Sequence, residues 1–124
     1  MNNHAETTAV KKVIEAYMTG TYRADVPMLE SVFHPRAVMN GYLGPDKILG
    51  TPALFIQDMA SAPSMEANGD SYQAEIEQIR IDGNIATVIV SESGFRGSAC
   101  LVDHFHLIKE DGSWHIISKL FTTV

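Results

Sequence analysis

The C-terminal stretch 99–123 decides the fold, and its sequence is ACLVDHFHLIKEDGSWHIISKLFTT. Two runs rich in apolar and β-branched residues, 99–109 and 113–123, flank Glu110-Asp111-Gly112. A short loop of this kind between two such runs is typical of a β-hairpin. The sequence therefore predicts two neighbouring antiparallel strands at the end of the chain.

The length of this loop sets which residues face each other across the hairpin. With a three-residue loop, Lys109 pairs with Ser113, and Asp103 then lies directly opposite Lys119, with Cβ atoms about 5 Å apart. With a two- or four-residue loop, Lys119 faces His104 instead. We expect the three-residue loop, and hence an acid–base pair that is partly withdrawn from water.

Further strands are predicted upstream of this hairpin. The runs 72–81 and 85–93 flank Asp82-Gly83-Asn84, a tight-turn sequence. The alternation of 72–81 breaks in its middle, which indicates a bulge. A short strand is expected at 37–42.

The first half of the chain shows helical spacing. Val10, Val13, Ile14 and Tyr17 form the stripe of an amphipathic helix that begins near residue 9 and ends near Gly20. Two more helices are expected over 26–33 and 52–60, each with proline in its first turn, and 62–70 is expected to be a loop. Helices followed by a run of strands indicate an α+β fold, and the chain is short enough to form one domain, residues 1–124.

Composition narrows the class of protein. The chain has 124 residues, 45% of them hydrophobic and 19% charged, which is ordinary for a globular protein. A net charge of −6 argues against nucleic acids and anionic membranes as partners. A single cysteine, polar residues at 1–8 and the lack of an apolar run of about 20 residues lead us to expect a cytoplasmic protein. Cys100 is expected to pack in its strand.

Several segments, taken in order, resemble the nuclear-transport-factor-2-like (NTF2-like) superfamily, and within it the SnoaL-like or "putative lumazine-binding" branch. They are Tyr17 with Gly20, the junction 33–37, the stretch 79–86, Asp103, and the ending 109–121. The resemblance implies a cone with a cystatin-like fold, in which three N-terminal helices pack on a curved, mixed, mainly antiparallel sheet. It also implies a pocket between sheet and helices and, often, a homodimer. It does not imply one activity, because this fold serves many functions.

The last hairpin supports the dimer independently. One face carries Leu101, Phe105, Leu107, Ile117 and Phe121, and the other carries Val102, Ile108, Trp114, Ile116 and Leu120. The helices can cover only one of these faces, so we expect a second copy to cover the other.

Two residues are candidates for acid–base chemistry. Asp103 can act as an acceptor or general base that Lys119 orients, although the pair can instead be a structural ion pair. His34 changes charge near neutral pH and can serve a pocket mouth, or it can cap the end of a helix.

Candidate ligand-binding residues are those expected to face the pocket. Tyr17 can donate from the helical stripe or simply belong to the core, and Glu92 can be a second pocket carboxylate or a solvated strand end. The full set is Tyr17, Phe33, Phe55, Met59, Glu92, Phe105 and Lys119. His104 and His106 share a strand face, but no helical His-x3-His or Cys pair supports them, so we expect no metal. The sequence has no glycine-rich phosphate loop and no dinucleotide fingerprint, so we expect no cofactor.

Three functions remain open. The leading hypothesis is a dimeric protein that binds a small, mostly apolar or aromatic ligand. The alternatives are a cofactor-free isomerase or dehydratase with an acidic or histidine base, and a protein-interaction module that uses the sheet.

Overall fold

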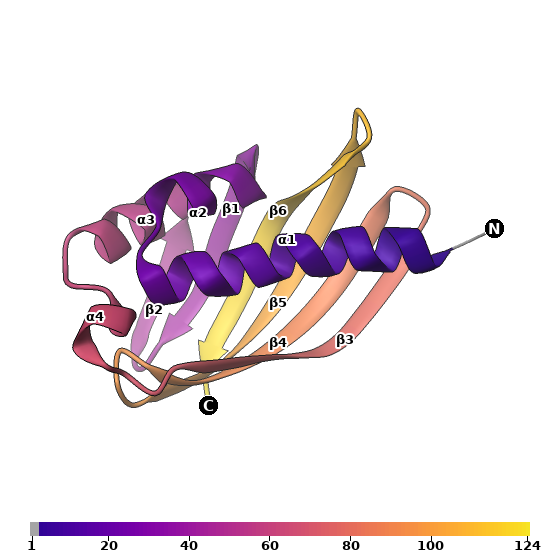
Figure 1. The fold of residues 1–124 in the computed structure, drawn as a ribbon. Helices are drawn as coiled ribbons and strands as arrows, with labels where there is room; N and C mark the ends of the chain where they lie inside the picture. Colours follow the sequence, from indigo (N-terminus) through magenta and orange to yellow (C-terminus); the bar gives the residue numbers. More distant parts are fainter. Residues whose placement is uncertain (1–2) are drawn as a thin grey trace.

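A computed structural model describes residues 3–124, in which helices cover one face of a six-stranded sheet (Figure 1). The helices are α1 (Asn3–Arg23), α2 (Val26–Val32), α3 (Pro52–Ala60) and α4 (Met65–Asn68). The strands are β1 (Phe33–Leu43), β2 (Asp46–Gly50), β3 (Gln73–Asp82), β4 (Ile85–Phe95), β5 (Ala99–Glu110) and β6 (Ser113–Thr123).

The sheet is mixed, with the order β2-β1-β6-β5-β4-β3. Only the β1–β6 pair is parallel, and the other four pairs are antiparallel. This confirms the curved, mainly antiparallel α+β fold. The break expected in 72–81 is a register shift between Ile76 and Gln78.

The helices differ from the prediction mainly at their ends. The buried stripe of α1 is as expected, with Val10, Ile14 and Tyr17 inside. The helix begins earlier, at Asn3, and passes through Gly20 to end at Arg23, where Ala24 takes a positive φ of 52°. The first two residues of the polar stretch 1–8 lie outside the described residues. Asp25 caps α2, as its Oδ1 accepts a 3.1 Å hydrogen bond from the amide of Met28.

Two short elements were not predicted. The turn-rich segment after β1 contains strand β2, which pairs with β1 from Leu43↔Asp46 to Met39↔Gly50. The expected loop 62–70 contains the one-turn helix α4, capped by Ser64 and ended by Gly69 in the left-handed conformation. Strand β1 is also longer than expected and begins at Phe33.

The register expected for the last hairpin is wrong, although Asp103 and Lys119 do share a face. Glu110 pairs with Ser113 around a two-residue loop, but a bulge at Ile117 shifts the pairing beyond it. Asp103 therefore lies opposite Phe121, and Lys119 lies opposite Phe105. Asp103 and Lys119 are diagonal neighbours on the inner face.

The bulge also changes which residues pack inside. Trp114 and Ile116, expected on the outer face, are buried in the core. Ile117, expected inside, is the extra residue of the bulge and is half-buried. The bulge thus lets both ends of β6 place large side chains against the helices.

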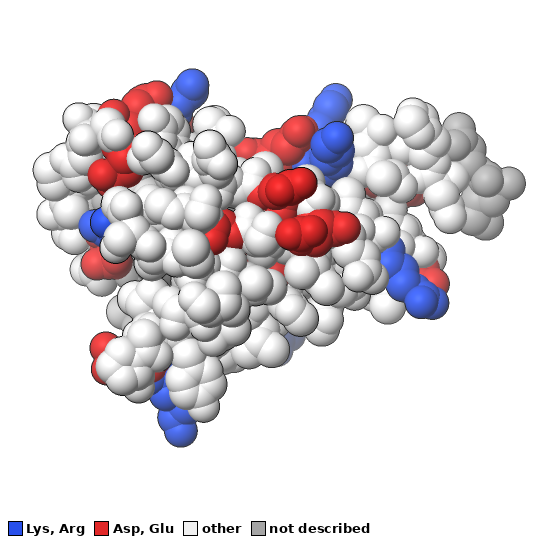
Figure 2. Space-filling model, turned by 90° about the horizontal axis from the view of Figure 1, so that it is seen from below, with Lys and Arg blue, Asp and Glu red and all other residues white. Residues whose placement is uncertain are grey.

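Figure 1 shows α1 crossing in front of the sheet, with the shorter helices near β1 and β2. The opposite, outer face carries exposed apolar side chains on three neighbouring strands, including Val38, Tyr42 and Leu120. Cys100, expected to pack, is exposed. On the face seen in Figure 2, acidic side chains gather near the centre and the Lys and Arg side chains form small separate groups, in line with the acidic net charge.

Candidate functional site

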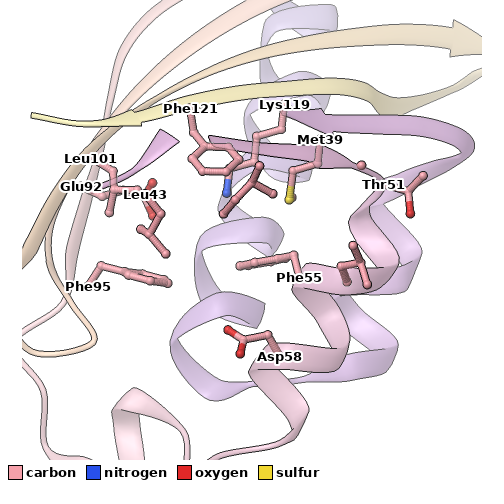
Figure 3. A pocket seen from close by; sticks show the side chains of 13 residues that line it. Met39, Leu43, Thr51, Phe55, Asp58, Glu92, Phe95, Leu101, Lys119 and Phe121 are labelled. Atoms are coloured by element: carbon pink, nitrogen blue, oxygen red, sulfur yellow. The ribbon is translucent and has the colours of Figure 1, made fainter. Parts of the chain in front are cut away.

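A cavity of about 280 Å³ lies between α3, the β1–β2 hairpin and the inner face of the sheet (Figure 3). Most of its wall is apolar, and two buried charged side chains, Glu92 and Lys119, complete it. The lining residues are Met39, Leu43, Ile48, Gly50, Thr51, Leu54, Phe55, Asp58, Glu92, Phe95, Leu101, Lys119 and Phe121.

Local sequence rules place these side chains. Strand alternation turns Glu92, Leu101, Lys119 and Phe121 toward the helices, since successive side chains of a strand point to opposite faces. Pro52 in the first turn of α3 fixes where this helix begins, and the helix carries Phe55 over the cavity.

Lys119 is 5% exposed and sits in a ring of aromatic side chains. Its Nζ lies 4.6 Å from the ring centre of Phe55, 4.9 Å from that of Tyr17 and 5.1 Å from that of Phe121. It also donates a 2.5 Å hydrogen bond to the Tyr17 hydroxyl. Aromatic faces attract cations, so these contacts hold the ammonium group in place.

Asp103 lies behind the cavity wall and is fully buried. Its Oδ1 is 3.9 Å from Lys119 Nζ, and neither of its carboxyl oxygens has a hydrogen-bond partner among residues 3–124. Burial raises the pKa of Asp103 well above its usual range; the Lys119 ammonium opposes this shift, and the neighbouring Glu92 carboxyl adds to it.

Glu92 is the buried carboxyl group that borders the cavity. The Tyr72 hydroxyl donates a short hydrogen bond to its Oε2. Burial, followed by the charge of Glu92, strongly raises the pKa of Tyr72, and burial with the charges of Asp103 and Glu92 raises that of Tyr17. Both phenols therefore keep their protons at neutral pH, and Tyr72 acts as a donor to Glu92.

Comparison with protein families identifies the group to which this architecture belongs. The family model described as "Putative lumazine-binding" matches residues 5–122. The chain belongs to this family. No curated protein matched the chain.

Solved structures share the fold of this family member at low sequence identity. An NTF2-like protein of unknown function from Shewanella baltica is 23% identical, with a TM-score of 0.87 over 100% of this chain and 98% of its own. A second, from Silicibacter pomeroyi, is 22% identical, with a TM-score of 0.88 over 100% of both chains. A ketosteroid isomerase-like protein from Erwinia carotovora atroseptica is 19% identical, with a TM-score of 0.70 over 98% of each chain. These likenesses confirm the NTF2-like fold expected from the sequence.

Five of the predicted site residues meet in or directly behind the cavity of this family member. Glu92, Lys119 and Phe55 line it, and Asp103 and Tyr17 contact Lys119 from behind. The predicted site thus gathers around the Lys119 ammonium.

The remaining predicted residues lie outside the cavity lining. Phe105 and Phe33 pack against the Tyr17 ring, with ring centres 4.9 and 6.2 Å away, and Met59 is buried within α3. His34 belongs to β1 rather than to a helix end, and its Nε2 lies 2.7 Å from Glu110 Oε1.

The sequence analysis missed Tyr72, Phe121 and the pair between Asp58 and Arg96. Phe121 could have been found, since it is two residues from Lys119 and shares its face. Tyr72 and Arg96 carry no local signal, because their partners are 20 and 38 positions away.

His104 and His106 are exposed on the outer face, and within residues 3–124 no three His, Cys, Asp or Glu side chains are grouped to hold a metal ion. In the same part of the chain, no helix is both long and apolar enough to cross a membrane.

Proposed function

We propose that the protein binds a small, mostly apolar ligand in the cavity between α3 and the sheet. The observation that carries the proposal is the pairing of an apolar, aromatic wall with two buried charges, Glu92 and Lys119, in one cavity. Ligand pockets typically combine a largely apolar lining with a few well-placed polar groups. A volume of about 280 Å³ suits a ligand of one or two rings.

The polar groups define what the ligand must offer. Lys119 has three N–H donors and gives one to Tyr17, so it favours a carbonyl or another acceptor on the ligand. Tyr72 donates to Oε2 of Glu92, and Oε1 takes no part in that bond, so Glu92 favours a ligand that carries a hydrogen-bond donor. The rings of Phe55, Phe95 and Phe121 favour a flat, conjugated body.

Lumazine, the bicyclic dione named in the family description, fits these requirements and is the first probe. Its ring carbonyls offer acceptors, its ring N–H groups offer donors, and its fluorescence reports binding. We expect saturable binding at one site per chain in a fluorescence titration, confirmed by calorimetry.

Two variants and one control locate the site. Leu101→Trp fills the cavity and Phe55→Ala removes part of its wall, so each should weaken binding at least tenfold. Leu49→Trp makes the same change as the first variant on a residue that is 68% exposed and outside the lining, and it should bind as the wild type does. If lumazine does not bind, or if Leu101→Trp binds it unchanged, the proposal is wrong.

We also propose that the outer face of the sheet pairs with a second copy of the chain. Val38, Tyr42, Ile85 and Leu120 are 43–60% exposed there, and the helices cover only the other face. Sedimentation at micromolar concentration should give twice the chain mass of 13.6 kDa. Leu120→Lys should shift the protein to monomer, and a monomeric wild type would refute the proposal.

A matched control for this experiment lies on the helical layer. Gln57 on α3 is exposed, and Gln57→Lys adds the same charge away from the proposed interface. It should leave the sedimentation of the wild type unchanged.

A further inference from the structure

The outer face of the sheet has a centre that is almost free of charged side chains. Apart from Glu110 at the end of β5, the outward positions of β4, β5 and β6 hold no Asp, Glu, Lys or Arg. The edge strand β3 differs, because it exposes Glu75, Arg80 and Asp82 on the same face. A centre without charges and a polar rim are typical of a protein interface. The titratable side chains in this centre are those of Cys100, His104, His106 and His115.

His104 and His106 lie in the middle of the face. Strand β5 lies between β4 and β6 (Figure 1), and both histidines are exposed on it. Leu120 lies directly opposite His104, and Thr87 and Ser118 lie opposite His106 on the two neighbouring strands. In the described part of the chain, no hydrogen bond or ion pair holds either imidazole. Their ring nitrogens are therefore open to a ligand from outside the chain.

The spacing of the two imidazoles suits a shared metal ion. They are two residues apart on one strand, so their Cα atoms are separated by about 6.7 Å. Two nitrogens bound to one tetrahedral zinc ion lie about 3.4 Å apart, because each Zn–N bond is about 2.0–2.1 Å long. Each ring thus needs to lean by less than about 2 Å toward the other, which side-chain rotation supplies. Imidazole is also a ligand that Zn²⁺ prefers.

One chain supplies only half of a tetrahedral site. Within residues 3–124, no third His, Cys, Asp or Glu side chain is grouped with the two histidines. A second copy on the outer face changes this count. In a two-fold pair, a residue near the axis meets the same residue of the other copy. Strands β5 and β6 are the middle strands of the sheet, so a pair that covers this face brings the two β5 strands together.

We propose that His104 and His106 of two copies bind one Zn²⁺ ion on the two-fold axis between them. This site rests on the proposed pairing of the outer faces. Packed sheets lie about 10 Å apart, a gap that two facing imidazoles and an ion between them can span. Four nitrogen ligands complete a tetrahedron and leave no open position, so the ion is structural and holds the two copies in one register.

The neighbouring hydroxyl groups can orient the ligands. A histidine that binds a metal through one ring nitrogen usually donates the N–H of the other to an acceptor. Thr87 and Ser118 place hydroxyl groups on both sides of His106. Either hydroxyl can accept this hydrogen bond.

The test begins with protein that carries no histidine tag and has been dialysed against EDTA. After the EDTA is removed, calorimetry with zinc chloride should give one ion for every two chains. Sedimentation should show that the dimer dissociates at least tenfold less readily in zinc than in EDTA, because an ion that binds only the pair stabilises it. Cobalt(II) in place of zinc should give the strong visible absorption of a tetrahedral site.

Three variants locate the ligands. His104→Ala and His106→Ala should each weaken zinc binding at least tenfold and remove the effect of zinc on sedimentation. Both residues are exposed, so both variants should keep the circular dichroism of the wild type. His4→Ala makes the same change on an exposed residue of α1, in the helical layer, and should bind zinc as the wild type does.

Failure of the metal site can be told apart from failure of the pairing. A dimer that forms in EDTA and neither binds zinc nor becomes tighter with it overturns the metal site and leaves the pairing intact. Zinc bound at one ion per chain, with unchanged sedimentation, also overturns the shared site. A chain that is monomeric in EDTA and in zinc refutes both proposals. If the chain is monomeric in EDTA and pairs at one zinc per two chains, and His106→Ala abolishes this, the metal site stands and the metal-free pairing is refuted.

Discussion

Replacing Lys119 with methionine removes the buried ammonium and keeps a side chain of similar length. In the wild type, Nζ of Lys119 lies 3.9 Å from Asp103 Oδ1, and the Asp103 carboxyl is fully buried. Glu92 adds a second carboxyl to the same inner face. The variant therefore leaves buried negative charge without the cation beside it, and we expect a marked loss of stability.

Two estimates give the size of this loss. Unit charges 3.9 Å apart attract by about 4 kcal/mol at an effective dielectric constant near 20, which is an upper limit here because burial raises the pKa of Asp103. Removing one partner of a buried ion pair typically costs about 3–5 kcal/mol. We therefore expect Lys119→Met to lower the free energy of unfolding by about 3–5 kcal/mol at pH 8.

The loss should shrink at lower pH. The folded-state pKa of Asp103 is raised, so the folded state binds a proton more tightly than the unfolded state, and this group's contribution to stability falls as pH rises. Removing Lys119 takes away the group that opposes this shift, so it raises the pKa of Asp103 further. As pH falls, the orphaned carboxyl takes up a proton, and the variant should recover part of its stability, at a slope of at most about 1.4 kcal/mol per pH unit for one proton.

Urea unfolding of four proteins measures the coupling: the wild type, Lys119→Met, Asp103→Leu and the double variant. The double variant has one buried carboxyl fewer, so it should be more stable than the sum of the single changes predicts, by about 2 kcal/mol. Single changes that each cost less than about 1 kcal/mol and add within about 0.5 kcal/mol would refute the reasoning. They would mean that the two groups are hydrated and do not interact.

Two further predictions concern the packing around the site. A Cβ atom on Gly41 would lie 2.0 Å from a backbone oxygen of β6, so Gly41→Ala should destabilise by about 1–3 kcal/mol or more in thermal unfolding, whereas Gly50→Ala meets only an ordinary 3.4 Å contact and should cost less. Hydrogen bonds from Lys109 and from the indole of Trp114 hold the pKa of Glu6 below its ordinary value of 4.5. The stabilising contribution of Glu6 is therefore complete above pH 4.5 and is lost as pH falls through its lowered pKa. Because Trp114 is the single tryptophan, its emission should change over that acid range in the wild type and not in Glu6→Gln.

Strand alternation and turn chemistry were enough to predict the sheet and most of the inner face. In β5 the side chains of Leu101, Asp103 and Phe105 alternate with those of the outer face without a break, so their placement follows from the period of two. The shared face of Asp103 and Lys119 follows as well, because the predicted and the observed registers differ by two residues. For this pair only the exact partner was wrong, whereas Trp114 and Ile116, which precede the bulge, were assigned to the wrong face.

The bulge at Ile117 could not be located from local rules. Ile116 and Ile117 are both apolar and β-branched, so neither breaks the strand pattern by itself. The sequence carries only a weak sign of the bulge. The large inward-facing side chains of β6 switch from even positions, Trp114 and Ile116, to the odd positions 119 and 121. A strand with one buried face can make that switch only if it contains an extra residue.

The short elements escaped prediction because their stability is not local. β2 has five residues and depends on pairing with β1, and α4 is a single turn held by its caps. Neither is long enough to show a period. β2 matters to the site, because Ile48 and Gly50 belong to the cavity wall.

The burial of Glu92 likewise depends on distant parts of the chain. From the sequence alone, a glutamate near the end of a strand can be a solvated strand end or a second pocket carboxylate. In the structure Tyr72 reaches it from a segment 20 positions away, and α3 closes the space in front of it. His34 is the opposite case, a predicted site residue that lies outside the cavity lining. Strand β1 begins one residue before it and places its side chain beside Glu110.

The arrangement around Lys119 argues for a role beyond holding the fold together. A pair kept only for structure is expected to satisfy all of its hydrogen bonds, because desolvating two charges costs more than an apolar pair of the same volume. Here the Asp103 carboxyl has no hydrogen-bond partner within residues 3–124, and its approach to Lys119 is a loose 3.9 Å. Lys119 and Glu92 also border a cavity, where water or a ligand can reach them. Strained or unsatisfied groups of this kind concentrate where function requires them. A double variant of Asp103 and Lys119 that is stable but no longer binds lumazine would separate that role from the fold.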